Sequence, residues 1–259
     1  MSAESFSALL LAHLLGDFIF QPARMAHAKG QRGMRARLPA LIAHTGVHLL
    51  VLGIILPAPD ALAALGLILL SHFVIDLAKP ALRGPALQVF MADQMAHLAV
   101  IVAVVLALPD LWSQTLWTQL QSPLISYLPT IFALIAGAIL TIRTGGFAIG
   151  ALMRPLADRA PEGGLPKGGQ LIGVLERALI FVLVLTAQPQ GIGFLIAAKS
   201  ILRFEAKGWP DHNAANEYVI IGTLASFGWA IACAYLTLGL LAHLAPIGIP
   251  ALGIPVPNP

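Results

Sequence analysis

The chain has 259 residues, of which 58% are hydrophobic and only 10% are charged. This small number of polar residues cannot cover the surface of a soluble domain of this size. The composition therefore excludes a soluble globular protein and predicts a membrane protein surrounded by lipids. The formal net charge of +3 does not indicate a nucleic-acid partner, because the basic residues follow the pattern of membrane topology instead.

Apolar stretches long enough to cross a hydrocarbon core of ~30 Å recur along the chain. They predict an all-α, polytopic transmembrane bundle of about eight spans, at 5–21, 38–56, 61–79, 88–108, 124–142, 169–188, 191–206 and 215–242. The seventh span is short and could be re-entrant. We expect a four-helix membrane region over 1–110 and a second helical membrane region over 111–259, whose Pro-rich tail after Pro246 is expected to be poorly ordered.

The basic residues predict how the spans are oriented. The connections expected in the cytoplasm carry Arg24, Lys29, Arg32, Arg35, Arg37, Lys79, Arg83, Arg143, Arg154, Arg159, Lys167 and Lys207. The connections on the opposite side carry Asp60 and Asp110 and neither Lys nor Arg. Because positive charge is retained inside, both termini are predicted on the outer side of the membrane.

Each of the first four spans carries two metal-type side chains four residues apart. The pairs are His13 with Asp17, His44 with His48, His72 with Asp76, and Asp93 with His97. A spacing of four residues brings both side chains to one helix face. Ionisable groups in a membrane span are costly and are found mainly where they pair, bind an ion or line a wet cavity. Four such pairs in consecutive spans therefore predict one shared site.

The first and third spans also resemble each other. The segment Leu-Leu-Leu-Ala-His13-x-x-x-Asp17-Phe parallels Ile-Leu-Leu-Ser-His72-x-x-x-Asp76-Leu, and a proline follows each, Pro22 or Pro80. We therefore expect the first four spans to form a duplicated helical hairpin, an arrangement that commonly places a site at the interface of its repeats.

The predicted depths of the eight side chains agree. Counted from the cytoplasmic ends at ~1.5 Å per residue, Asp17, Asp76, Asp93 and His44 form a layer ~5–10 Å deep, with His13, His48, His72 and His97 at ~10–15 Å. Imidazole and carboxylate together suit Zn, Mn, Fe or Ni, and eight ligands allow one or two ions. A hydrogen-bonded polar network, a proton relay and haem ligation are the alternatives.

The second half of the chain carries a different set of charges: Glu176, Arg177, Lys199, Arg203 and Glu217. Two readings stay open. Glu176 and Glu217 could form structural ion pairs with these cations, or Arg177, Lys199 and Arg203 could hold a phosphate-bearing substrate or a lipid head group.

Five stretches carry a resemblance to a known family: His13-Leu-Leu-Gly-Asp17-Phe-Ile-Phe-Gln21, His72-Phe-Val-Ile-Asp76-Leu-Ala-Lys79, Leu171-Ile-Gly173-Val-Leu-Glu176-Arg177, Ile196-Ala-Ala-Lys199-Ser-Ile-Leu-Arg203-Phe and Glu217-Tyr-Val-Ile-Ile-Gly222-Thr223. In these stretches the chain resembles an uncharacterised bacterial membrane family catalogued as domain of unknown function 3307. The resemblance implies an integral inner-membrane protein and no established reaction. The His/Asp-rich hairpins are also similar, in residue type alone, to membrane-bound metal-dependent hydrolases.

The leading functional hypothesis is a membrane-embedded, metal-dependent hydrolase that acts on an anionic, lipid-like substrate. Asp93 or Asp17 would serve as general base beside the metal. The first alternative is a carrier or channel for a divalent metal or for protons, which the apolar outer half of the first four spans disfavours. The second alternative is a non-catalytic membrane scaffold or sensor, whose polar cluster only holds helices together.

Overall fold

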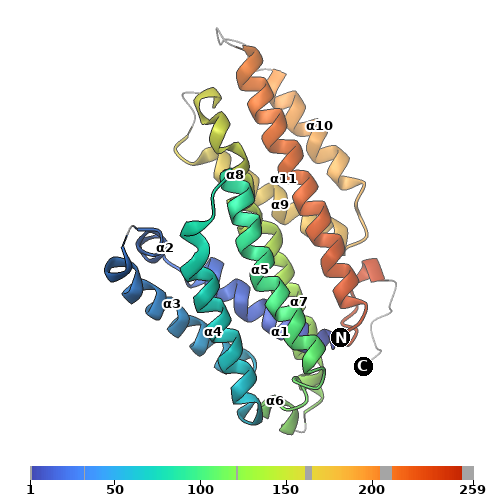
Figure 1. Ribbon diagram of the computed structural model, residues 1–259. Helices are drawn as coiled ribbons and strands as arrows, with labels where there is room; N and C mark the ends of the chain where they lie inside the picture. Colours follow the sequence, from blue (N-terminus) through green and yellow to red (C-terminus); the bar gives the residue numbers. More distant parts are fainter. Residues whose placement is uncertain (1, 32, 121, 161–164, 205–211, 253–259) are drawn as a thin grey trace. The chain divides into compact units, whose positions relative to one another are not determined.

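The described part of the chain is all-helical. Figure 1 shows the computed structural model, which describes residues 2–31, 33–120, 122–160, 165–204 and 212–252. The chain folds into two compact units: unit 1 comprises Met1–Ile139 and Leu240–Ile247, and unit 2 comprises Leu140–Gly239 and Gly248–Pro259. Unit 1 therefore contains the whole four-helix region that we expected over 1–110.

Unit 1 is built around a closed ring of four helices. In this ring α1 contacts α3 and α5, and α4 contacts the same two helices from the other side, while α7 packs on α1 outside the ring (Figure 1). Its helices are α1 (Ala3–Leu14), α2 (Ala23–Lys29), α3 (Met34–Ile55), α4 (Leu62–Ala78), α5 (Ala86–Ala107), α6 (Leu116–Gln119) and α7 (Leu128–Ala138).

The first helix changes its winding just where it carries Asp17. α1 begins after Ser2, whose hydroxyl accepts a hydrogen bond from the backbone N–H of Ser5, and it continues as a π-helix over Leu15–Ile19. A π-turn is rare and is frequently found at functional sites. The chain then bends by 94° at Pro22 into α2, which packs against α3. The bend brings the basic end of α2 back to the ring.

Among the described residues, six helical segments are long and apolar enough to cross a membrane, or up to seven if the bent pair of α1 and α2 counts as one span. The prediction of an all-α, multi-pass membrane protein is confirmed, with fewer spans than the eight expected. The six are Met34–Ile55, Pro59–Ala81, Ala86–Ala107, Pro123–Arg159, Gly168–Leu185 and Ala214–Leu241.

The seventh expected span accounts for part of the difference in number. It is α10 (Gly191–Phe204), which has 14 residues. At ~1.5 Å per residue the described part of this helix is about 21 Å long, against a hydrocarbon core of ~30 Å. The turn at Pro189 precedes its first residue, and residues 205–211, which follow its last described residue, lie outside the described part.

A second π-helix, Ile139–Thr144, leads into α8, and its residues from Leu140 onward belong to unit 2. α9 contacts α8, α10 and the short 3-10 turn Pro250–Leu252 in the Pro-rich tail, whose last residues, 253–259, lie outside the described part. The helices of this unit are α8 (Gly145–Met153), α9 (Gly168–Leu185), α10 and α11 (His212–Leu241).

Candidate metal centre

The histidines and aspartates of the first four predicted spans converge inside the ring of α1, α3, α4 and α5. Two come from each helix, α1 supplying Asp17 from its π-helical end, and all are buried except Asp17, which is intermediate with a side chain 9% exposed. The predicted buried His/Asp cluster is therefore confirmed. Its members are His13, Asp17, His44, His48, His72, Asp76, Asp93 and His97.

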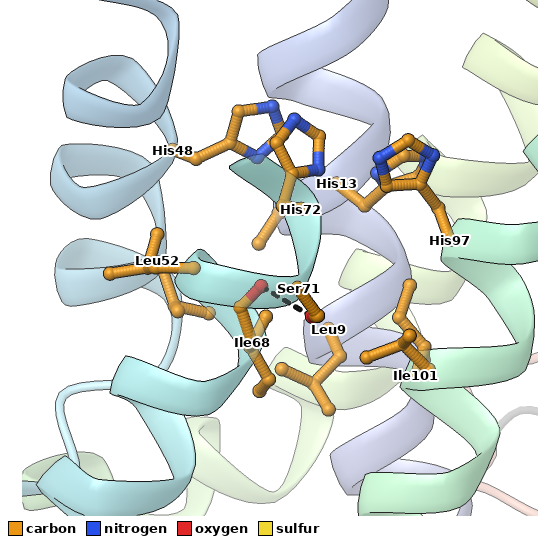
Figure 2. Close-up of a pocket in the computed structure, with 12 residues that line it drawn as sticks. Leu9, His13, His48, Leu52, Ile68, Ser71, His72, His97 and Ile101 are labelled. Carbon is orange, nitrogen blue, oxygen red and sulfur yellow. Dashed lines mark hydrogen bonds between the residues drawn. The ribbon is translucent and has the colours of Figure 1, made fainter. Parts of the chain in front are cut away.

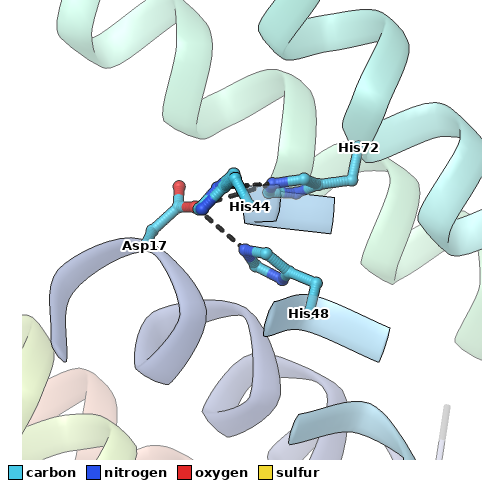
Figure 3. Close-up of side chains that lie close together, drawn as sticks. All are labelled: Asp17, His44, His48 and His72. Atoms are coloured by element: carbon cyan, nitrogen blue, oxygen red, sulfur yellow. Dashed lines mark hydrogen bonds and ion pairs between the residues drawn. The ribbon is translucent and has the colours of Figure 1, made fainter. Parts of the chain in front are cut away.

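One donor atom each from Asp17, His44, His48 and His72 lies within 4.8 Å of the other three (Figure 3). Asp17 Oδ1 lies 3.0 Å from His44 Nε2, 3.1 Å from His48 Nε2 and 3.6 Å from His72 Nε2. His44 Nε2 and His72 Nε2 are 3.1 Å apart. Bonds of about 2.0–2.1 Å in a tetrahedral zinc site place neighbouring ligand atoms about 3.3 Å apart. These separations therefore fit the edges of a metal coordination tetrahedron.

Gly16 makes room for one of these ligands. A Cβ atom at this position would overlap Cε1 and Nε2 of the His48 ring and lie 2.8 Å from its Cδ2. The ring of His48 thus packs directly on the backbone of the π-turn, beside the carboxylate of Asp17. A residue without a side chain is required here for the close approach of α1 and α3.

A second set of donors gathers around His97. Its Nδ1 lies 2.9 Å from the backbone oxygen of Asp93, which places the proton on Nδ1 and leaves the lone pair on Nε2. Nε2 of His97 and Oδ1 of Asp93 are buried and have no hydrogen-bond partner among the described residues. Donor atoms of His72, Asp76 and His97 lie within 4.8 Å of one another, as do those of His13, Asp17 and His97.

Two lysines contact the centre. Lys29 Nζ lies 2.6 Å from Asp76 Oδ2, and Lys79 Nζ lies 2.6 Å from Asp93 Oδ2. Arg37 holds the end of α2 in place, because it donates to the backbone oxygens of Lys29, at 2.9 Å, and Leu77, at 2.8 Å. The sequence analysis used these two lysines only to predict the orientation of the spans. Their positions near the ends of α2 and α4, close to spans that contain aspartates, could have indicated the ion pairs.

Two glutamines complete the hydrogen-bond network. Gln94 donates to Asp17 Oδ2 at 3.3 Å and to Asp93 Oδ2 at 3.1 Å, and its oxygen lies 3.2 Å from His13 Nε2. Gln21 Nε2 lies 3.3 Å from His44 Nδ1. Partners of this kind orient the ligands of a metal site and tune its affinity.

A small cavity adjoins the cluster. His13, His48, His72 and His97 line it, the same four residues that we predicted for the deeper layer, whereas none of the four predicted for the shallower layer does (Figure 2). The rest of its wall is almost entirely apolar, and the hydroxyl of its one other polar residue, Ser71, donates to the backbone oxygen of Ile68. The other lining residues are Leu9, Ala12, Leu52, Ile68, Leu69, Val100 and Ile101.

In unit 2, Arg177 and Lys199 contact different partners. Arg177 is buried; its Nε donates to the oxygen of Ile142 at 3.1 Å and its Nη1 to Ser226 Oγ at 3.1 Å. Lys199 Nζ lies 2.7 Å from Glu176 Oε1, so one of the expected ion pairs is formed. Of the remaining candidates, Glu217 is exposed on α11, and the side chain of Arg203 in α10 lies outside the described part.

Residues 5–124 match the model of a protein family described as Protein of unknown function (DUF3307). This segment contains the ring of helices and all eight cluster residues, and it supports the resemblance over the first part of the chain. No curated protein and no solved structure matches the chain. The match names no reaction, so the function has to be argued from the cluster itself.

Proposed function

We propose that this membrane protein binds a divalent transition metal ion at Asp17, His44, His48 and His72. The observation that carries the proposal is the 3.0–3.6 Å separation of Asp17 Oδ1 from the three imidazole Nε2 atoms. A mixed set of imidazole and carboxylate ligands suits Zn, Mn, Fe or Ni better than Ca or Mg.

The activity we propose is metal-dependent hydrolysis of an anionic, lipid-like substrate. A bound divalent ion would activate a water molecule and polarise an acyl or phosphoryl oxygen. Asp93 is the proposed general base, since its buried Oδ1 has no partner among the described residues, whereas Asp17 belongs to the tetrahedral set.

Transport of a divalent metal or of protons is the second candidate. The observation in its favour is that the three possible ligand groups overlap, sharing Asp17, His72 and His97, so that an ion could pass from one group to the next. The apolar wall of the adjoining cavity weighs against it, because Leu9, Leu52 and Ile101 offer an ion no ligands there.

Metal analysis of the purified protein tests the binding site. Mass spectrometry should find one ion per chain in wild type and none in His44→Ala, while His27→Ala, which removes an exposed histidine of α2, should keep the ion. Absence of metal from wild type would refute the proposal and would favour a non-catalytic scaffold or sensor instead.

Activity assays then separate the two candidate functions. Asp93→Asn should retain the bound ion but lose hydrolysis of a phospholipid or isoprenoid phosphate. Metal uptake into proteoliposomes, with no turnover of any such substrate, would favour transport instead.

We further propose that the protein lies in a bacterial inner membrane with the metal centre near the cytoplasmic face and the N-terminal end of α1 outside. Lys29, Arg37 and Lys79 meet at one end of unit 1, as the positive-inside rule requires of a cytoplasmic end. The variant Arg83→Cys in a Cys233→Ala background should react with a membrane-impermeant thiol reagent only in inverted vesicles. Reaction in intact cells would overturn this orientation.

A further inference from the structure

Asp17 differs from the other two carboxylates of the cluster in what it contacts. Lys29 Nζ lies 2.6 Å from Asp76, and Lys79 Nζ lies 2.6 Å from Asp93. Within the described part of the chain no lysine contacts Asp17, whose charged or chargeable neighbours are histidines. A buried carboxylate needs a paired cation to offset its desolvation. Of the three carboxylates, Asp17 is therefore the one whose charge is left for bound metal ions.

The two carboxylate oxygens of Asp17 lie beside different histidines. Oδ1 lies 3.0 Å from His44 Nε2 and 3.1 Å from His48 Nε2, in the group that binds the proposed first ion. Oδ2 lies 3.8 Å from Nε2 of His13, which does not belong to that group. A carboxylate whose two oxygens face different ligand groups is placed to bridge two ions.

His97 adds a free donor on the side of His13. One donor atom each from His13, Asp17 and His97 lies within 4.8 Å of the other two, and the rings of the two histidines are stacked with their centroids 4.9 Å apart (Figure 2). His97 is only 3% exposed, and its buried Nε2 has no hydrogen-bond partner among the described residues. A buried polar atom without a partner is rare and calls for an explanation, which a bound ion would supply.

We propose that His13, Asp17 and His97 bind a second divalent transition metal ion, and that the carboxylate of Asp17 bridges the two ions. The inference rests on the proposed binding of a first ion at the group that Figure 3 shows, with which this position shares Asp17 but no histidine. In two-metal hydrolytic sites, ions about 3.5–4 Å apart stabilise the attacking and the leaving oxygen together.

The remaining ligand group is a poorer position for a second ion. It consists of His72, Asp76 and His97. His72 already belongs to the group of the first ion, and Lys29 already neutralises Asp76. An ion there would have to displace the lysine and compete for the imidazole, whereas the position at His13 requires neither.

The second ion is expected to bind more weakly than the first. Its position has three protein donors instead of four, and the 3.8 Å between His13 Nε2 and Asp17 Oδ2 exceeds the edge of about 3.3 Å in a tetrahedral zinc site. The ion also has to replace the contact of 3.2 Å between His13 Nε2 and the oxygen of Gln94. One ligand fewer corresponds to a Kd weaker by on the order of 100-fold, so purification retains the first ion and loses the second.

Three protein donors also leave a coordination position for water. Zinc sites that carry out catalysis have three protein ligands and a bound water, whereas structural sites have four protein ligands. His13 and His97 both line the cavity beside the cluster, whose volume of about 30 Å³ exceeds the ~10–15 Å³ that a water molecule needs (Figure 2). Of the two ions, the second is therefore the one that holds the water.

The test is a titration of the full chain in detergent with Mn²⁺ alone, with bound metal counted after equilibrium dialysis and its spectrum recorded by electron paramagnetic resonance. Wild type should bind one ion tightly and a second with a Kd on the order of 100-fold weaker. The two-ion form should show the exchange coupling that a bridging carboxylate transmits. His97→Ala should bind only the first ion, while the control His27→Ala, which removes an exposed histidine of α2, should bind both.

The outcomes separate the two proposals. A single ion in wild type at saturation would overturn the second position and leave the first intact, and no ion in wild type would overturn both. Two ions in folded His97→Ala would refute His97 as a ligand, and loss of both ions from it would refute two separate positions. Two ions without exchange coupling would refute the bridge by Asp17. If His97→Ala does not fold, His13→Ala takes its place with the same expected single ion.

Discussion

Replacement of Gly16 by alanine should disable the metal centre without altering any ligand. The added Cβ would overlap two atoms of the His48 ring and lie 2.8 Å from a third, Cδ2. Since carbon atoms pack comfortably at about 3.5–4.0 Å, the ring has to withdraw by about 1 Å. Metal–ligand distances tolerate deviations of only about 0.2 Å. His48 is therefore expected to leave the coordination shell.

The expected loss of metal affinity follows from the contribution of one ligand to the binding free energy. Structural zinc sites bind with about 10–16 kcal/mol, so one of four ligands contributes about 3 kcal/mol on an equal division. This corresponds to a Kd weaker by on the order of 100-fold. Helix propensity does not oppose the substitution, because alanine is favoured over glycine by about 1 kcal/mol in a helix.

The assay is a zinc titration by calorimetry on purified protein, with circular dichroism to confirm that the helices are retained. Gly46→Ala is the control: Gly46 lies in α3 near His48, and a Cβ there meets nothing within 4 Å. It should leave the Kd unchanged. A folded Gly16→Ala protein that binds zinc within a few-fold of wild type would refute the tetrahedral assignment of His48.

Two further predictions concern side chains that support the structure. Gln94→Leu removes the donor to Asp17 and Asp93, so it should weaken metal binding by about 10- to 100-fold in the same titration while the protein stays folded; an unchanged Kd would contradict this role. Arg177→Met removes a buried cation that donates to the backbone oxygen of Ile142 and to Ser226. It should lower the stability of unit 2 by about 2–4 kcal/mol in thermal unfolding and leave the metal content unchanged, and loss of metal would show that the units are coupled.

The convergence of the cluster could be predicted from the sequence because two strong constraints act together. Ionisable side chains four residues apart share a helix face, and hydrocarbon excludes them from the lipid-facing side. The pairs His13/Asp17 and His72/Asp76 had to face the same interior whatever the details of packing. Helix rise gives the relative positions of the histidines along their helices, and their depth in the membrane stays a prediction. The duplication of the two hairpins stays a prediction.

What the sequence could not reveal depends on the exact course of the backbone. Periodicity assumes a uniform α-helix, so it does not predict the π-turn at Leu15–Ile19 or the contact of Gly16 with His48. Lys29 meets Asp76 only because the chain turns back after Pro22, a bend that no local pattern specifies. Among the described residues α10 has the composition of a span but only 14 residues, and helix boundaries are where sequence reasoning is weakest.

The placement of Asp17 in the first helix has a consequence for biosynthesis. Asp17 leaves the ribosome before most of the residues that contact it, because His44 and His48 lie in α3, His72 in α4 and Gln94 in α5, whereas His13 of its own helix precedes it. An aspartate at the centre of a membrane helix costs about 2.5–3.5 kcal/mol during insertion, which is an upper value for Asp17 at the π-helical end of α1. α1 is therefore translated before the three helices that hold most of its contacts, and a nascent chain halted ahead of α4 would place this carboxylate in the membrane without His72 and Gln94.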